Sequence, residues 1–89
     1  MELVALTPEK ELFNGKITSV KVPGINGQFE ILNGHASIVA ALAKGEVRIL
    51  DESGAKTTFN IHKGFIEVLN NEVSLLIQSM DKELSLIHI

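Results

Sequence analysis

The stretch GFIEVLNNEVSLLIQ, residues 64–78, decides the fold of this chain. In its second half, apolar residues alternate with polar ones, and this period of two is typical of a strand with one buried face. The alternating apolar positions are Val73, Leu75 and Ile77. Asn70 and Asn71 separate this run from the apolar segment before it, and asparagine tolerates the positive φ that a two-residue hairpin turn requires. The stretch therefore predicts two antiparallel strands joined by a tight turn.

Similar short runs, bounded by Asn-Gly, Pro-Gly or Lys-Gly, fill the rest of the chain. Such regular turn signals between β-branched segments indicate an antiparallel sandwich or barrel. We predict strands near 2–7, 10–13, 16–22, 28–32, 38–43, 46–51, 56–62, 64–69 and 72–78. The expected fold is therefore an all-β, antiparallel β-sandwich of about nine or ten short strands.

Two segments are ambiguous or fall outside this pattern. Residues 36–43 are rich in alanine, so periodicity alone leaves a short buried helix open there. We expect residues 1–78 to form the domain and residues 79–89 to form a short C-terminal tail. In the tail, Met80, Leu84 and Ile87 have the i, i+4 and i+7 spacing of a short helix, and we expect them to lie back on the sandwich or to remain loose.

Composition excludes several classes of function. The chain has 89 residues, a net charge of −3, no cysteine, no tryptophan and no tyrosine. A nucleic-acid surface would need a basic stripe and aromatic platforms, so no nucleic-acid partner is expected. The longest apolar run, residues 38–43, is far shorter than the roughly 20 residues that span a bilayer. No direct insertion into a membrane is therefore expected.

The sequence contains no recognisable catalytic arrangement. Its three histidines are far apart, none lies in a metal-binding spacing, and neither a nucleophile elbow nor a phosphate-binding loop is present. We therefore predict no catalytic residue, no metal and no cofactor. Lys44 and Lys63 lie at predicted turns, as the modified lysines of lipoyl and biotinyl carrier domains do, although neither has the flanking Asp or Met of a carrier hairpin. A stand-alone carrier domain, or a protein-interaction module, thus stays open as an alternative.

The ordered motifs of the chain resemble one family, the amino-terminal β-sandwich of the epsilon subunit of F-type ATP synthases. The resemblance rests on TPEKELF at 7–13, VKVPG at 20–24, GHA at 34–36, GEVRI at 45–49, GFIEV at 64–68 and NNEV at 70–73. It also favours a strand over a helix at residues 36–43. Asn33 and Ser37 stand where the family commonly has proline, so we expect a looser loop there.

The resemblance implies a non-catalytic rotor subunit of the central stalk, which binds the gamma subunit and the c-ring and couples proton flow to ATP synthesis. It would act at the cytoplasmic face of the bacterial inner membrane, as a peripheral subunit. The residues that the resemblance assigns to gamma are Thr7, Ile38, Ala40 and Leu42. Those that it assigns to the c-ring are Gly27, Gln28, Asn33, Gly34 and His35.

Longer members of the family continue into a two-helix hairpin that restrains ATP hydrolysis and in some members binds ATP. Eleven residues after Gln78 would give about 16 Å of helix at most, at 1.5 Å per residue. We therefore expect a short form without the hairpin, with no ATP binding and no inhibition by that route.

Overall fold

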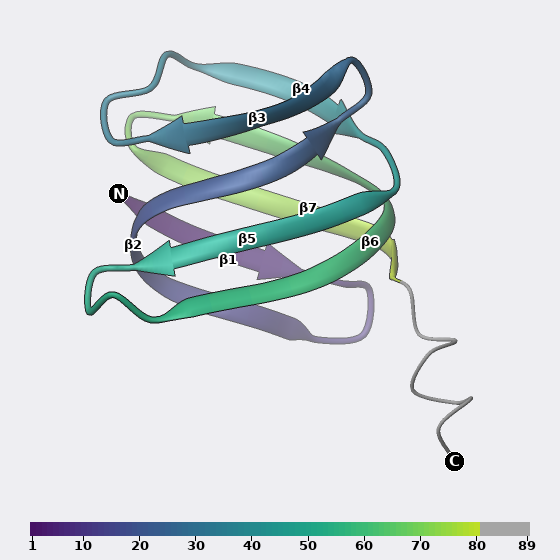
Figure 1. Cartoon of the computed structure of the whole chain (residues 1–89), viewed down its shortest axis with the longest axis horizontal. Coiled ribbons are helices and arrows are strands. Elements are labelled where there is room, and N and C mark those ends of the chain that lie inside the picture. Colours follow the sequence, from purple (N-terminus) through teal and green to yellow (C-terminus); the bar gives the residue numbers. More distant parts are fainter. Residues whose placement is uncertain (81–89) are drawn as a thin grey trace.

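The computed structural model describes residues 1–80, and these residues form seven strands and no helix (Figure 1). The strands are β1 (Glu2–Leu6), β2 (Glu11–Gly24), β3 (Gly27–Leu32), β4 (Ile38–Leu42), β5 (Gly45–Asp51), β6 (Lys56–Leu69) and β7 (Glu72–Met80). The all-β class is confirmed. The alanine-rich segment forms β4, so the helical alternative is wrong.

The predicted number of nine or ten strands is wrong, because β2 and β6 each join two predicted strands. The turn signal at Asn14 and Gly15 lies inside β2, where these residues pair with Val4 and Leu3 of β1. The second signal, at Lys63 and Gly64, lies inside β6, where the register with β7 shifts on both sides of Lys63. Both strands therefore continue through the residues that were expected to form a turn. In β2 these residues pair regularly with β1, and in β6 they lie at a break in the register.

The expectation of a purely antiparallel sheet is also wrong, since β1 and β7 pair in parallel while the other pairs are antiparallel. The two 14-residue strands pass from one layer of the sandwich to the other. β6 pairs with β5 along its first half and with β4 and β7 along its second half. β2 pairs with β1 first and then with β5 and β3. Figure 1 shows β6 curving from the front layer to the back one.

Apolar side chains from both layers fill the space between them. The strand register places residues that point into this space side by side, as in the row Leu3, Val73, Val68 and Ile38. The fully or almost fully buried residues are Leu3, Ala5, Ile17, Val20, Val22, Ile31, Leu42, Val47, Ile49, Ile61, Ile66, Val68, Val73, Leu75 and Ile77. The alternating positions quoted from the sequence thus form the core, as predicted.

The predicted hairpin between β6 and β7 is confirmed. Asn70 and Asn71 have φ values of +51° and +62°, and Leu69 pairs with Glu72 across the turn. Two consecutive positive φ values define the turn whose twist matches that of the flanking strands.

Part of the predicted tail belongs to this hairpin as well. Ser79 and Met80 extend β7, and Met80 packs partly buried against the core. Leu84 and Ile87, which we expected to lie on the sandwich or to remain loose, lie outside the described residues.

The turn between β5 and β6 is held by one carboxylate. Asp51 Oδ1 accepts hydrogen bonds from Ser53 N at 2.9 Å, Ser53 Oγ at 2.7 Å and Ala55 N at 3.0 Å. The Ser53 hydroxyl is the largest cause that lowers the pKa of Asp51, and the backbone N–H groups act in the same direction. The turn is therefore most stable with this carboxyl ionised.

We predict that Gly64→Ala destabilises the protein by about 1–3 kcal/mol. A Cβ at Gly64 would lie 2.7 Å from the Leu76 carbonyl oxygen of the neighbouring strand, which is backbone and cannot move aside freely. Gly15→Ala is the matched control in the other long strand, because its Cβ would lie 3.6 Å from the Phe13 ring. Urea denaturation measures both variants, and equal losses of unfolding free energy would contradict the packing argument.

We predict that Asp51→Ala destabilises the chain at neutral pH and that its difference from the wild type shrinks in acid. Because the pKa of Asp51 is lowered in the folded state, its contribution to stability is present above the ordinary carboxyl pKa of about 4 and is lost as the pH falls below it. Urea midpoints measured from neutral pH down to acid test this sign. A difference that stays constant with pH would show that the charge of Asp51 contributes nothing.

Candidate protein-interaction surfaces

Residues 1–80 contain neither a cluster of metal-ligating side chains nor a helix able to span a membrane. In this part of the chain no three His, Asp or Glu residues come together as metal ligands could. The same residues contain no helix with the length and apolar character needed to cross a membrane. Lys63 lies within β6 and not at a hairpin tip, whereas Lys44 lies between β4 and β5. The exposed large apolar side chains are the features that remain as candidates for function.

Four apolar side chains form a continuous row on the outer face of the layer β1-β7-β6-β4. The register places Ala41 beside Phe65, Phe65 beside Leu76, and Leu76 beside Leu6. Leu6, Phe65 and Leu76 are 37%, 41% and 46% exposed, although a sheet face in contact with water is usually polar. We call this row the outer stripe (Leu6, Ala41, Phe65 and Leu76).

The outer stripe continues beyond its four members. Val39 and Leu69 point from β4 and β6 to the same face and are 73% and 54% exposed, with the exposed Glu67 opposite Val39 and between Phe65 and Leu69. At the other end, Leu6 and Leu76 line a hollow of about 270 Å³ that Thr7 and Pro8 also border. Exposed apolar side chains that form one continuous patch typically mark an interface with another protein.

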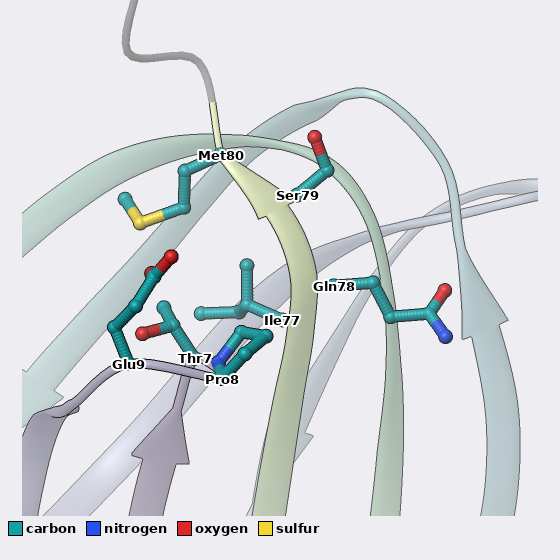
Figure 2. Close-up of a pocket in the computed structure, with 7 residues that line it drawn as sticks. All are labelled: Thr7, Pro8, Glu9, Ile77, Gln78, Ser79 and Met80. Carbon is teal, nitrogen blue, oxygen red and sulfur yellow. The ribbon is translucent and has the colours of Figure 1, made fainter.

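Thr7, a predicted contact with gamma, lies in the turn after β1 at this end of the stripe. Its hydroxyl is 3.1 Å from both the carbonyl oxygen and the amide nitrogen of Lys10, and the Thr7 N–H donates to the same carbonyl at 2.8 Å. Figure 2 shows Ile77 and Met80 facing this turn from β7, while Gln78 points away from it. The turn is therefore held in a defined position beside the outer stripe.

The other predicted gamma contacts lie on the inner side of β4. Ile38 and Ala40 are half-buried against the core, and Leu42 is only 3% exposed. Their strand neighbours Val39 and Ala41 take the outward positions instead. Since β4 pairs with β6 along its length and with β2 only at Leu42, Ile38 and Ala40 still border an open strand edge.

The predicted c-ring contacts form two groups at opposite ends of β3. Gly27 and Gln28 begin this strand, and Asn33, Gly34 and His35 follow its end. At 3.3 Å per residue the groups are roughly 20 Å apart, so a partner that contacts both must extend along β3. Figure 1 shows β3 at the upper rim of the sandwich. β3 pairs only with β2, which leaves its other edge open along this rim.

The second of these groups lies in a loop that is tied to a distant hairpin. We call residues 33–37, between β3 and β4, the rim loop. The Gly34 N–H donates a hydrogen bond of 2.8 Å to Asn71 Oδ1 in the β6–β7 turn. The Gly34 φ of +83° suits glycine. The rim loop is therefore hydrogen-bonded to the β6–β7 turn at Gly34, and its looseness relative to the family stays a prediction.

Sequence analysis missed the outer stripe, although the sequence carries a signal for it. Leu76 interrupts the alternation of β7, and Phe65 does the same in β6, since their neighbours Leu75 and Ile66 are already buried. An apolar residue at an outward position in each of two paired strands indicates a second apolar surface.

Comparison with known proteins identifies relatives over nearly the whole chain. Residues 1–83 match the family described as ATP synthase, Delta/Epsilon chain, beta-sandwich domain. The chain is 44% identical over 75 residues to the ATP synthase epsilon chain of Chlorobaculum tepidum, covering 84% of this chain and 85% of that one. It is 40% identical over 79 residues to the same subunit of Chlorobium limicola, covering 89% and 90%.

Solved structures confirm the fold. A chain of the Euglena gracilis mitochondrial ATP synthase, in an OSCP/F1/c-ring structure, matches with a TM-score of 0.80 at 20% identity. A chain of the Tetrahymena thermophila mitochondrial ATP synthase, in a central stalk/c-ring structure, gives 0.75 at 17% identity. The matches cover 97% and 90% of this chain but 59% and 64% of those longer chains.

Proposed function

Because this chain belongs to the family of ATP synthase Delta/Epsilon chains, as their β-sandwich domain, we propose that it couples proton flow to ATP synthesis as a rotor subunit. It is an epsilon-type, non-catalytic subunit. In this role it binds the gamma subunit and the c-ring at the cytoplasmic face of the bacterial inner membrane, without inserting into it. The match over residues 1–83 is the observation that carries the proposal.

The outer stripe supports a place for gamma on this sandwich. Its exposed apolar side chains lie on a paired sheet face. A partner that buries them gains hydrophobic free energy, and little conformational entropy is lost because the strands are already ordered. Thr7 borders the stripe at one end, whereas Ile38 and Ala40 lie on the inner side of β4, beside its open edge. Leu42 supports this surface from the core side.

The rim along β3 supports the second contact, with the c-ring. Gly27, Gln28, Asn33 and Gly34 are exposed and uncharged, and His35 is half-buried. The rim therefore offers hydrogen-bonding groups and open backbone to polar loops of a partner. It also follows the open edge of β3, where no strand of the described part of the chain competes for these groups.

We predict that Phe65→Glu weakens binding of purified gamma roughly tenfold to a hundredfold, because burial of a phenylalanine contributes about 1.5–3 kcal/mol. Phe65 is already 41% exposed, so the substitution should leave the sandwich folded, as a urea midpoint would check. Leu50→Glu is the control, since Leu50 is 37% exposed on β5, which does not belong to the layer of the stripe. Calorimetric titration with gamma measures both variants, and equal affinities would refute this surface.

The carrier alternative predicts a different result. A lipoyl or biotinyl carrier would gain mass on Lys44 or Lys63 when it is produced together with the corresponding ligase. We expect an unchanged intact mass, because Lys63 lies inside a paired strand and Lys44 connects β4 and β5, which do not pair with each other, so neither lysine lies at the tip of a hairpin. A mass increase at either lysine would favour the carrier function over the rotor function.

A further inference from the structure

Asn71 connects three parts of the fold at one point. Its backbone adopts the second positive φ of the β6–β7 turn, +62°. Its carbonyl oxygen accepts the Glu2 N–H at 3.0 Å, which ties the start of β1 to the turn. Its side-chain Oδ1 accepts the Gly34 N–H of the rim loop at 2.8 Å, across 37 residues of sequence.

The hydrogen bonds of the rim loop differ in range. The His35 N–H donates to the Leu32 carbonyl at 3.0 Å, and His35 Nδ1 lies 2.7 Å from the Ala36 carbonyl oxygen. Both of these contacts are local, so they can shape the loop but cannot fix its place on the sandwich. The bond to Asn71 joins the loop to a hairpin of the core.

We propose that Asn71 is a positioning residue, whose side-chain oxygen holds the rim loop in the place from which Asn33, Gly34 and His35 contact the c-ring. The part that concerns the c-ring rests on the proposed function. The hydrogen bond between Asn71 and Gly34 does not depend on that function. An anchored loop enters a complex with less conformational entropy to lose, and binding is tighter for that reason.

The anchored nitrogen also has a chemistry of its own. In an Asn-Gly pair, the glycine nitrogen can lose its proton to water and attack the asparagine Cγ, with release of ammonia and formation of a cyclic imide. Water then opens the imide to aspartate or isoaspartate, so that one water is consumed and one ammonia is lost overall. The Gly34 nitrogen is the nucleophile for Asn33, and its N–H is held by Asn71 Oδ1. This hydrogen bond between the Gly34 N–H and Asn71 Oδ1, which we call the latch, therefore protects Asn33 from deamidation.

Two further Asn-Gly pairs serve as internal references. Asn14 and Gly15 lie within β2, paired with β1, where the ladder restricts the backbone rotation that imide formation needs. Asn26 and Gly27 lie exposed at the turn between β2 and β3, with a Gly27 φ of +125°. We expect Asn26 to deamidate first in the wild-type protein, with Asn33 slower as long as Asn71 holds Gly34.

Three substitutions separate the latch from the turn. Asn71→Gly keeps the positive φ and the backbone bond to Glu2 but removes the side-chain oxygen. Asn71→Asp replaces the amide oxygen with a carboxylate oxygen that can still accept the hydrogen bond, and aspartate tolerates the same φ. Asn70→Asp adds the same charge at the neighbouring position without touching the latch. All three retain a turn sequence that suits a hairpin.

Amide hydrogen exchange and peptide mass analysis test the latch directly. In Asn71→Gly, we expect the Gly34 amide to exchange about tenfold faster, as for the loss of one hydrogen bond. We also expect Asn33 to deamidate faster, while the rate at Asn26 stays unchanged. Fragment ions of the tryptic peptide 22–44 distinguish the two sites. Two results would overturn the latch. One is wild-type amide exchange at Gly34 and wild-type deamidation at Asn33 in the Asn71→Gly variant. The other is faster amide exchange at Gly34 in the Asn71→Asp variant.

Binding to an isolated c-ring, in complex with gamma, tests the functional part. We expect Asn71→Gly to bind severalfold more weakly, and Asn71→Asp to match Asn70→Asp, which carries the same charge. If Asn71→Gly binds the c-ring with wild-type affinity while its Gly34 amide exchanges faster, the positioning role of Asn71 is overturned. Failure of the wild-type protein to bind the ring would refute the proposed function instead, and the exchange result would still decide on the latch.

Discussion

The register between β6 and β7 is the constraint on which the rest of the structure depends. It pairs Ile66 with Leu75 and Phe65 with Leu76, which assigns the first pair to the core and the second to the outer stripe. Since successive side chains point to opposite faces, a slip of one residue would exchange these two sets. The two-residue turn at Asn70 and Asn71 prevents that slip, because its positive φ values fix which residues stand opposite each other.

The two long strands make the two layers one body. β6 changes layers at the irregularity around Lys63, where the backbone comes so close to β7 that only glycine fits at position 64. β2 makes the corresponding crossing after its pairing with β1. A load applied to either layer is thus transmitted along hydrogen-bonded strands and not through flexible connections.

The sequence predicted those features that depend on neighbours along the chain. Alternation located the strands, and paired asparagines located the hairpin, since both signals are local. The turn signals at Gly15 and Gly64 were misleading because glycine also serves inside a strand, where another backbone approaches closely. Which residues of β4 face outward, and which side chains meet Phe65, depended on the pairing of strands far apart in the sequence. These could not be predicted from one strand alone.

The proposed contact surfaces are joined by the β6–β7 hairpin. This hairpin carries Phe65 and Leu76 of the outer stripe on its strands and Asn71 at its turn. Phe65 and Asn71 are six residues apart, so the stripe and the anchor of the rim loop lie on one continuous, paired segment. Since each strand of the hairpin is also paired on its other side, with β4 and β1, the hairpin cannot twist without breaking ladders across the layer. A partner on the stripe and a partner on the rim would therefore keep a fixed relative orientation, which is the mechanical property that a rotating stalk requires.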